Sequence, residues 1–369
     1  MKLTRVLLVA FTFAFLASCT NDDNENVSKG NYDNCTNDDN ENVSKGNYDN
    51  GVFILNEGNS SGGSVSFLGD DLTTFKQDVY GAENPGDLAG AGKYLQNIFF
   101  DGDKAYVIAG GSNVINVVNR YTFKLLAKIE TGLITPRYGV VKNGKAYVTN
   151  ANTYAYANPA TGNTDDFVAV IDLATNKVES KINLNATANR IVLEGDKLYI
   201  TEPYNSDKVL VVNTVTKALE TPITVGSSAN TMEVKNGILY VLASPYGSAS
   251  KIVKVKLSDK SITEVVFPSA LTDAGNLDIY GSKIYFTKDT GVYSMDIAAT
   301  QPSDEPIFNY SSTSKYGVMY GFAVENDKIY IADGGDFASN SKAYVYSLTG
   351  TLQKEITVGV GPNGFYFNN

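Results

Sequence analysis

The fold is decided by six related stretches of sequence, which read GDKAYVIAG (102–110), NGKAYVTNA (143–151), GDKLYITEP (195–203), NGILYVLAS (236–244), GSKIYFTKD (281–289) and NDKIYIADG (326–334). Each stretch starts with turn residues and continues as a short apolar strand that has a tyrosine near its beginning. Successive tyrosines are 41 to 52 residues apart. A repeat of this length, with several strands in each unit, is typical of a β-propeller.

Further strands surround each tyrosine strand. A second apolar strand follows it, as in NVINVVN (113–119), then a polar turn and a third strand, as in KVESKINL (177–184). A short apolar strand also precedes it, as in YGVVK (138–142). Glycine and other turn residues separate these strands, so we expect four antiparallel strands in each blade.

The two ends of the repeat region complete the count. GVFILNEGN (51–59) is a seventh equivalent, with Phe53 in the tyrosine position, but it lacks an inner strand. The last residues, GPNGFYFNN (361–369), supply an inner strand with no blade of its own. We therefore predict an all-β, seven-bladed β-propeller over residues 51–369, closed by pairing of 363–367 with the first blade. Six or eight blades remain alternatives.

The N-terminal segment has the pattern of an export signal. An apolar run at 6–16 follows two cationic residues and is too short to span a bilayer. It ends in Leu16-Ala17-Ser18-Cys19, which resembles a bacterial lipobox. We expect residues 1–18 to be a lipoprotein signal peptide and Cys19 to carry the lipid. The alternative is an ordinary signal peptide with a chance cysteine.

Residues 19–34 have the sequence CTNDDNENVSKGNYDN, and residues 35–50 are an exact tandem repeat of it. Such a polar sequence is too poor in apolar residues to bury a core, so we predict a disordered acidic tether. Calcium binding at Asp22-Asp23 and Asp38-Asp39 is the alternative, although the spacing of an EF-hand is missing. A calcium ion at the later turn DGGD (333–336) is a further alternative.

The amino-acid composition excludes several kinds of catalytic and metal-binding site. The chain has no histidine, and its two cysteines, Cys19 and Cys35, both precede the repeats. Histidine-based acid–base catalysis, serine–histidine triads and histidine metal ligands are therefore excluded. The net charge of −10 gives no basic footprint for nucleic acid. We expect no cofactor, no metal and no enzymatic activity.

Several motifs resemble a known family. Residues 147–150 read YVTN, and VAVIDLATNKVESKI (168–182) is similar to the second half of a YVTN-type propeller repeat. ILNEGN (54–59) and TPRYGVVKNGKAYVTN (135–150) resemble surface propeller lipoproteins of Bacteroidota. Some of those bind corrinoids, such as cobalamin and cobinamide, beside a TonB-dependent transporter. The resemblance implies a lipid-anchored protein on the outer membrane at the cell surface.

Candidate ligand-binding residues come from loops that a propeller collects on one face. Tyrosine offers rigid contact area with a polar tip, and arginine and asparagine bind amide or phosphate groups. The candidates are Tyr94, Gln96, Arg137, Tyr138, Tyr154, Tyr156, Arg190, Tyr204, Asn230, Tyr246, Asn276, Tyr316 and Asn363.

The alternative is that these residues have only structural roles. The arginines would then donate hydrogen bonds to loop carbonyls, and Asn230, Asn276 and Asn363 would be turn residues. The repeated tyrosines of the strands are expected in the core.

Three functions follow from these features. The first is capture of a small molecule, with a corrinoid as the best single guess, handed to a TonB-dependent transporter. The second is a non-catalytic interaction scaffold at the cell surface. The third is a propeller enzyme, such as a lyase or dehydrogenase, for which no paired catalytic motif is found.

Overall fold

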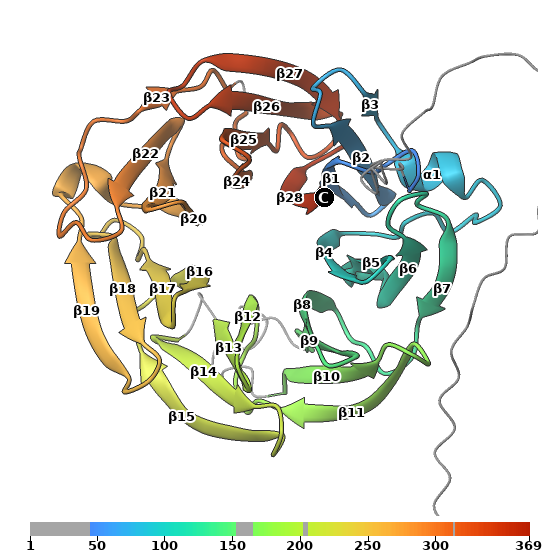
Figure 1. The fold of residues 1–369 in the computed structure, drawn as a ribbon, viewed down its shortest axis with the longest axis horizontal. Helices are drawn as coiled ribbons and strands as arrows, with labels where there is room; N and C mark the ends of the chain where they lie inside the picture. Colours follow the sequence, from blue (N-terminus) through green and yellow to red (C-terminus); the bar gives the residue numbers. More distant parts are fainter. Residues whose placement is uncertain (1–44, 153–164, 202–205, 313) are drawn as a thin grey trace, which may run out of the picture. The chain divides into compact units, whose positions relative to one another are not determined.

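The repeated strands form seven four-stranded antiparallel sheets around a common centre (Figure 1). This computed structural model describes residues 45–152, 165–201, 206–312 and 314–369. The predicted seven-bladed β-propeller with four antiparallel strands in each blade is thereby confirmed.

Blades are numbered by their place in the chain, and strands are given from the centre outward. The first blade is β28 (Pro362–Asn368), β1 (Gly51–Asn59), β2 (Gly62–Gly69) and β3 (Phe75–Lys76). The second is β4 (Leu95–Asp101), β5 (Lys104–Ala109), β6 (Val114–Asn119) and β7 (Leu125–Ile129). The third is β8 (Pro136–Lys142), β9 (Lys145–Asn150), β10 (Phe167–Asp172) and β11 (Lys177–Asn183).

The remaining blades follow the same order. The fourth is β12 (Ile191–Glu194), β13 (Lys197–Thr201), β14 (Lys208–Asn213) and β15 (Ala218–Thr224). The fifth is β16 (Ala229–Lys235), β17 (Ile238–Ala243), β18 (Lys251–Lys256) and β19 (Ser261–Val266). The sixth is β20 (Gly275–Tyr280), β21 (Lys283–Lys288), β22 (Gly291–Asp296) and β23 (Phe308–Asn309), and the seventh is β24 (Gly321–Glu325), β25 (Lys328–Asp333), β26 (Ser341–Ser347) and β27 (Leu352–Val358).

The ring closes through the two ends of the repeat region, as predicted. Strand β28 pairs antiparallel with β1, with Gly51 opposite Asn368 and Ile54 opposite Phe365. A register shift lies between Leu55 and Asn56, where β28 begins. Pairing of the last strand with the first removes a sheet edge that would otherwise be open to other chains.

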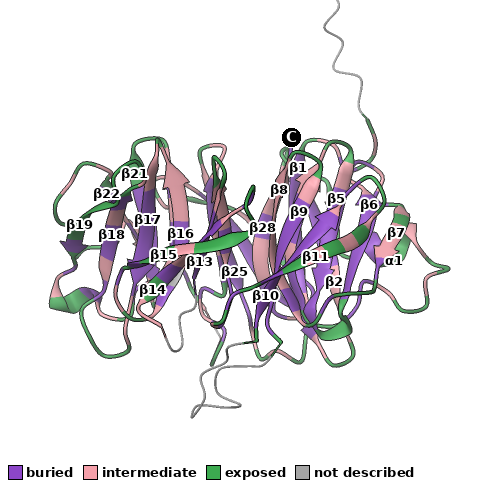
Figure 2. Cartoon of the chain, turned by 90° about the horizontal axis from the view of Figure 1, so that it is seen from below, coloured by how far each residue is buried: buried purple, intermediate pink, exposed green. Residues whose placement is uncertain are grey.

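Short turns join the first and second strands of the second to seventh blades on one side of the ring. At Asn143-Gly144 both turn residues have positive φ, 50° and 72°, which is the geometry of a two-residue hairpin whose twist matches the strands. We call this side the hairpin face and the opposite side the loop face. The chain ends on the hairpin face, beside β1 (Figure 2).

The core lies between blades, and the repeated aromatic residue builds it. Tyr106 packs in a cluster with Ala146 and Val148 of the next blade, and Tyr330 packs with Val52 and Ile54 of the first. The other repeated tyrosines follow the same rule, and Phe53 does so against the second blade. All are buried, so the expectation that these residues form the core is confirmed. Burial on both sides explains why the strands lack strict alternation.

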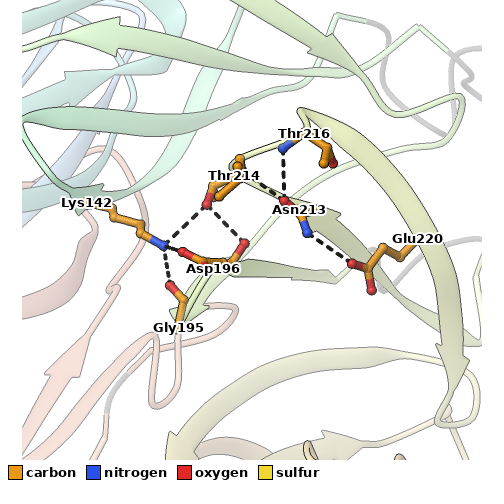
Figure 3. A network of polar contacts seen from close by, with 8 residues as sticks. Lys142, Gly195, Asp196, Asn213, Thr214, Thr216 and Glu220 are labelled. Carbon is orange, nitrogen blue, oxygen red and sulfur yellow. Dashed lines mark hydrogen bonds and ion pairs between the residues drawn. The ribbon is translucent and has the colours of Figure 1, made fainter.

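Polar contacts on the hairpin face also tie neighbouring blades together. The Lys142 ammonium at the end of β8 donates to the Gly195 carbonyl oxygen at 2.6 Å and contacts the Asp196 carboxylate and the Thr214 hydroxyl (Figure 3). Thr214 in turn donates to the Asp196 carbonyl oxygen at 3.0 Å. This network joins the third blade to the fourth through turns rather than through the core.

The end of the expected tether packs on the body. Tyr48 is 5% exposed and lies in the same cluster as Phe53, with its hydroxyl donating to Glu83 at 2.7 Å. Its amide donates to the Tyr121 carbonyl oxygen, and its own carbonyl oxygen accepts from Asn368. The folded body therefore begins before Gly51, because an aromatic side chain in an otherwise polar repeat fills a space between the first two blades.

The outer part of the first blade is irregular. Only Phe75–Lys76 pair as its fourth strand, and Val79–Glu83 form the helix α1 with Asp78 as its N-cap. The Asp78 side chain accepts from the Gly81 amide, which satisfies a free N–H of the first turn. Among the described residues, none of the helices has the length and hydropathy of a membrane span.

Candidate functional site

The inner strands surround a central cavity of about 460 Å³. Residues of β4, β8, β16, β20, β24 and β28 line it, together with residues at and just before the start of β12. A volume of roughly 300–1,000 Å³ is typical of small-molecule sites. Since the inner strands of all seven blades contribute to the lining, the shape of the cavity depends on the closed ring.

Arg190 supplies a positive charge to the cavity wall just before β12. Its guanidinium carbon lies 4.9 Å from the centre of the Tyr138 ring, which is a cation–π contact. Its Nε atom is buried and has no hydrogen-bond partner, and no carboxylate forms an ion pair with it within the described residues. A buried, unsatisfied guanidinium N–H costs free energy unless a ligand accepts from it.

A second arginine lies at the loop-face end of the neighbouring inner strand. The Arg137 guanidinium contacts the Asn189 side-chain oxygen at 3.5 Å. Nearby, the Glu57 carboxylate accepts from Gln96 at 3.2 Å and from the Tyr320 hydroxyl. Burial and the Glu57 charge raise the pKa of the Tyr320 hydroxyl, so it stays a neutral donor. These residues form a polar rim above the cavity.

The closing strand β28 completes the cavity wall. The Tyr366 hydroxyl accepts from the Asn97 amide at 3.3 Å and donates to the Gln96 carbonyl oxygen at 3.4 Å. Asn363 donates to the Leu95 carbonyl oxygen at 2.9 Å, and its side-chain oxygen is buried without a partner. Burial raises the pKa of Tyr366, and the cavity therefore presents a neutral phenol beside an unsatisfied amide oxygen.

Two carboxyl groups line the cavity nearer the hairpin face. Glu233 of β16 accepts from the Ile279 amide at 2.8 Å, and Asp278 of β20 accepts from the Val324 amide at 3.1 Å. Each carboxyl group therefore caps an N–H on the inner strand of the next blade, which faces the channel and has no strand partner. Glu325 of β24 also lines the cavity.

These carboxyl groups have unusual protonation behaviour. Burial, reinforced by the Asp278 charge, raises the pKa of Glu233 to about 8. Burial and the Glu325 charge raise the pKa of Asp278 to about 7, against the lowering effect of the Val324 amide. Among the described residues, no group of three or more acidic, histidine or cysteine side chains is arranged to hold a metal ion.

The structure brings several predicted candidates to this site. Tyr138, Arg190, Asn276 and Asn363 line the cavity, and Gln96 and Arg137 belong to the rim. Asn276 has a left-handed φ of 49° and donates to the Met319 carbonyl oxygen at 3.0 Å, so it also joins two blades.

Other candidates are elsewhere. Tyr246 is 96% exposed and Tyr316 is 74% exposed, and neither lines the cavity. Tyr94 is partly exposed near Gly111, also outside the cavity lining. Asn230 lies at a register shift in β16, and its side chain is not described. The candidates Tyr154, Tyr156 and Tyr204 lie outside the described residues, as does Cys19.

Sequence reasoning missed the deeper lining residues, chiefly Asn97, Glu233, Asp278 and Tyr366. The inner strands TMEVK (231–235) and NLDIY (276–280) were interpreted as simple apolar strands. A polar residue in the middle of each was the available signal, because such a position is otherwise apolar. Tyr320, missed as well, precedes β24 at the place where other blades carry Arg137 or Asn363.

Comparisons with solved structures agree on the fold. A quinonprotein alcohol dehydrogenase-like protein from Bacteroides thetaiotaomicron is 17% identical, with a TM-score of 0.64, over 87% of this chain and 79% of that chain. A periplasmic gluconolactonase from Pseudomonas aeruginosa is 14% identical, with a TM-score of 0.61, over 86% of this chain and 98% of that chain. At such identities the likeness shows the fold alone.

Two further comparisons concern the sequence. No curated protein matches it. A family model described as "Domain of unknown function (DUF5074)" matches residues 50–368.

Proposed function

Since the chain belongs to the DUF5074 family, whose description names no activity, we propose its function from the cavity: it binds a small organic anion. The observation that carries this proposal is Arg190. Its guanidinium lines the cavity without a carboxylate partner, and its buried Nε has no acceptor. A ligand phosphate or carboxylate that accepts from Arg190 would satisfy it with charge-assisted hydrogen bonds.

The surroundings of Arg190 suit an organic rather than a bare inorganic anion. The Tyr138 ring holds the guanidinium from one side, and the Tyr366 hydroxyl and the Asn363 amide line the same cavity. Tyrosine and amide groups give contact area and hydrogen bonds to a polar carbon skeleton. Arg137 adds a second guanidinium at the rim, where Glu57 also lies, so the rim can contact polar groups of an organic ligand.

A corrinoid is the second candidate, and the sequence resemblance together with the arginine and tyrosine residues of the loop face supports it. A cavity of about 460 Å³ is small for a whole corrin macrocycle, which would lie over the rim and insert only a side group. In this version the protein would be anchored through Cys19 at the cell surface and would pass the ligand to a TonB-dependent transporter. An interaction scaffold without a ligand remains the alternative for the loop face.

Calorimetric titration of the purified protein tests these proposals. We expect glucose 6-phosphate, as a probe for an organic anion, to bind at one site with micromolar to millimolar affinity. Arg190→Gln should weaken binding about 10- to 100-fold, since a hydrogen bond to a charged group contributes roughly 1.5–3 kcal/mol. Lys76→Gln, an exposed cation on β3, serves as the matched control and should change nothing.

Cyanocobalamin and cobinamide are titrated in parallel. Binding of a corrinoid in the micromolar range would support the second candidate, and its loss in Arg137→Gln would place the contact at the rim. Absence of binding by both corrinoids at micromolar concentration would reject that candidate. Binding of glucose 6-phosphate that is equal in wild type and Arg190→Gln would reject the first.

A further inference from the structure

The cavity wall carries a guanidinium group and two carboxyl groups that form no ion pair with each other. Arg190 lies on one part of its wall, and Glu233 and Asp278 lie on another. None of the three takes part in an ion pair within the described residues. A ligand with an anionic group near Arg190 and a cationic group near the carboxyls would give all three side chains an ion-pair partner.

Capping of backbone groups does not explain why the residues at two of these positions are acidic. Glu233 and Asp278 each accept from an amide of the next inner strand. Asn97 has the same capping role between β4 and β8, where its side-chain oxygen accepts from the Gly139 amide at 3.1 Å. A neutral amide is therefore sufficient for the capping role. The negative charge adds a desolvation cost that an amide would avoid.

The charged groups around these carboxyls leave them uncompensated. The Lys235 charge lowers the pKa of both groups, whereas the Glu325 charge raises both and the Asp278 charge raises that of Glu233. Burial is the largest cause, and the net result is a raised pKa for both carboxyls, which means that the cavity stabilises their charged forms poorly. Glu233 makes no hydrogen bond other than that with Ile279 in the described part of the chain.

The spacing of the two charged levels suits a small molecule. In the hairpin registers Arg190 lies four residues before Glu194, the last residue of β12, and Asp278 lies two residues before Tyr280, the last of β20. Glu233 holds the same place in β16 as Asp278 in β20. A difference of two residues corresponds to about 7 Å along a strand. A ligand that reaches both levels must span at least this height, which a phosphorylated sugar can do.

We infer that the cavity binds a dipolar ligand, with an anionic group at Arg190 and an ammonium group between the carboxyl groups of Glu233 and Asp278. The inference rests on the proposed binding of an organic anion and names its chemical class: an amino sugar phosphate or a compound with similarly placed charges. The ammonium group supplies the missing counter-charge, and its N–H groups donate to carboxylate oxygens. Its binding ionises the carboxyls, so protons are released to the solvent.

Three probes at pH 7 separate the parts of this inference. Glucosamine 6-phosphate carries both charges, glucose 6-phosphate lacks the ammonium, and N-acetylglucosamine 6-phosphate replaces the ammonium with a neutral amide. We expect glucosamine 6-phosphate to bind at least tenfold more tightly than either analogue that lacks the ammonium group. Calorimetry in two buffers of different ionisation enthalpy should show proton release for glucosamine 6-phosphate alone.

Variants that keep the capping geometry provide the control. Glu233→Gln/Asp278→Asn retains acceptors for the Ile279 and Val324 amides but removes the charges. It should abolish the preference, so that glucosamine 6-phosphate and glucose 6-phosphate bind with similar affinity. Glu264→Gln, an exposed acid on β19, should preserve the preference.

The outcomes are distinguishable. If glucose 6-phosphate binds through Arg190 but the amino group adds no affinity, the dipolar ligand is wrong and the organic-anion proposal stands. If none of the three sugar phosphates binds, both proposals are wrong. If the preference survives in the double variant, the ammonium contact lies elsewhere and the inference is overturned.

Discussion

Replacing Glu233 by glutamine should make the protein more stable at alkaline pH while leaving its stability at acidic pH unchanged. Burial holds the pKa of this carboxyl at about 8 in the folded state, against an ordinary value of 4.5. Below pH 4 the carboxyl is protonated in the folded and unfolded states alike. Between pH 4.5 and 8 the unfolded state loses its proton and the folded state keeps it, so the stability of the wild type falls as the pH rises.

The size of the effect follows from the pKa difference. Each pKa unit corresponds to about 1.4 kcal/mol, so the full difference sets an upper bound of about 5 kcal/mol. Partial contact with cavity solvent and coupling to Asp278 reduce it, because the two carboxyls titrate as a pair. We expect Glu233→Gln to be about 1–3 kcal/mol more stable than wild type at pH 8.5.

Urea unfolding at pH 4, 6, 7 and 8.5, followed by tyrosine fluorescence and circular dichroism, measures this difference. The stability gain of Glu233→Gln should grow from near zero at pH 4 to its full value at pH 8.5. Glu264→Gln is the control for loss of an exposed acid and should show no growing gain. A destabilisation by Glu233→Gln that is the same at every pH would refute the reasoning, since it would mean that the carboxylate is only a structural cap.

Three other changes test the fold and the site. Tyr48→Ala should lower the free energy of unfolding by about 3–5 kcal/mol, as expected for a large buried side chain, and Tyr48→Phe by about 1 kcal/mol through loss of the bond to Glu83; urea titration measures both. Deletion of 362–369 should give an open, aggregating ring because β1 loses its partner, visible as high-mass species in size-exclusion chromatography, whereas a monomer with native circular dichroism would contradict the closure. Arg190→Gln should leave the thermal midpoint nearly unchanged, because removal of the unpaired Nε offsets the loss of the cation–π contact with Tyr138; a clear drop would show that Arg190 is structural.

The repeat could be predicted from the sequence because each blade needs the same kinds of residue at the same positions. The turns at Asn143-Gly144 and its equivalents need residues that tolerate positive φ, and the aromatic residue that follows must fill the space to the next blade. Turn residues followed by an aromatic residue therefore recur in the sequence once per blade. Phe53 occupies the same position in the first blade, which identifies that blade although it lacks its own inner strand. The unassigned C-terminal strand could therefore be predicted to close the ring.

The site could be predicted only in part, because its residues differ from blade to blade and do not follow the repeat. Arg137, Tyr138 and Arg190 stand near the starts of inner strands, where a loop-face position can be inferred. Glu233, Asp278 and Tyr366 lie within inner strands, and only the ring brings them around one cavity. Tyr48 was assigned to the tether because its neighbours are polar. Its burial depends on a gap between Phe67 and Phe123 that sequence does not reveal.

The most direct test of the account is calorimetric titration of glucose 6-phosphate into the wild-type protein and into Arg190→Gln, at the same pH and salt concentration. The account predicts one binding site in the wild type and an affinity reduced about 10- to 100-fold in the variant, with unchanged circular dichroism. Equal affinities in the two proteins, or no binding heat in the wild type at millimolar ligand, would contradict the claim that the central cavity is an anion-binding site.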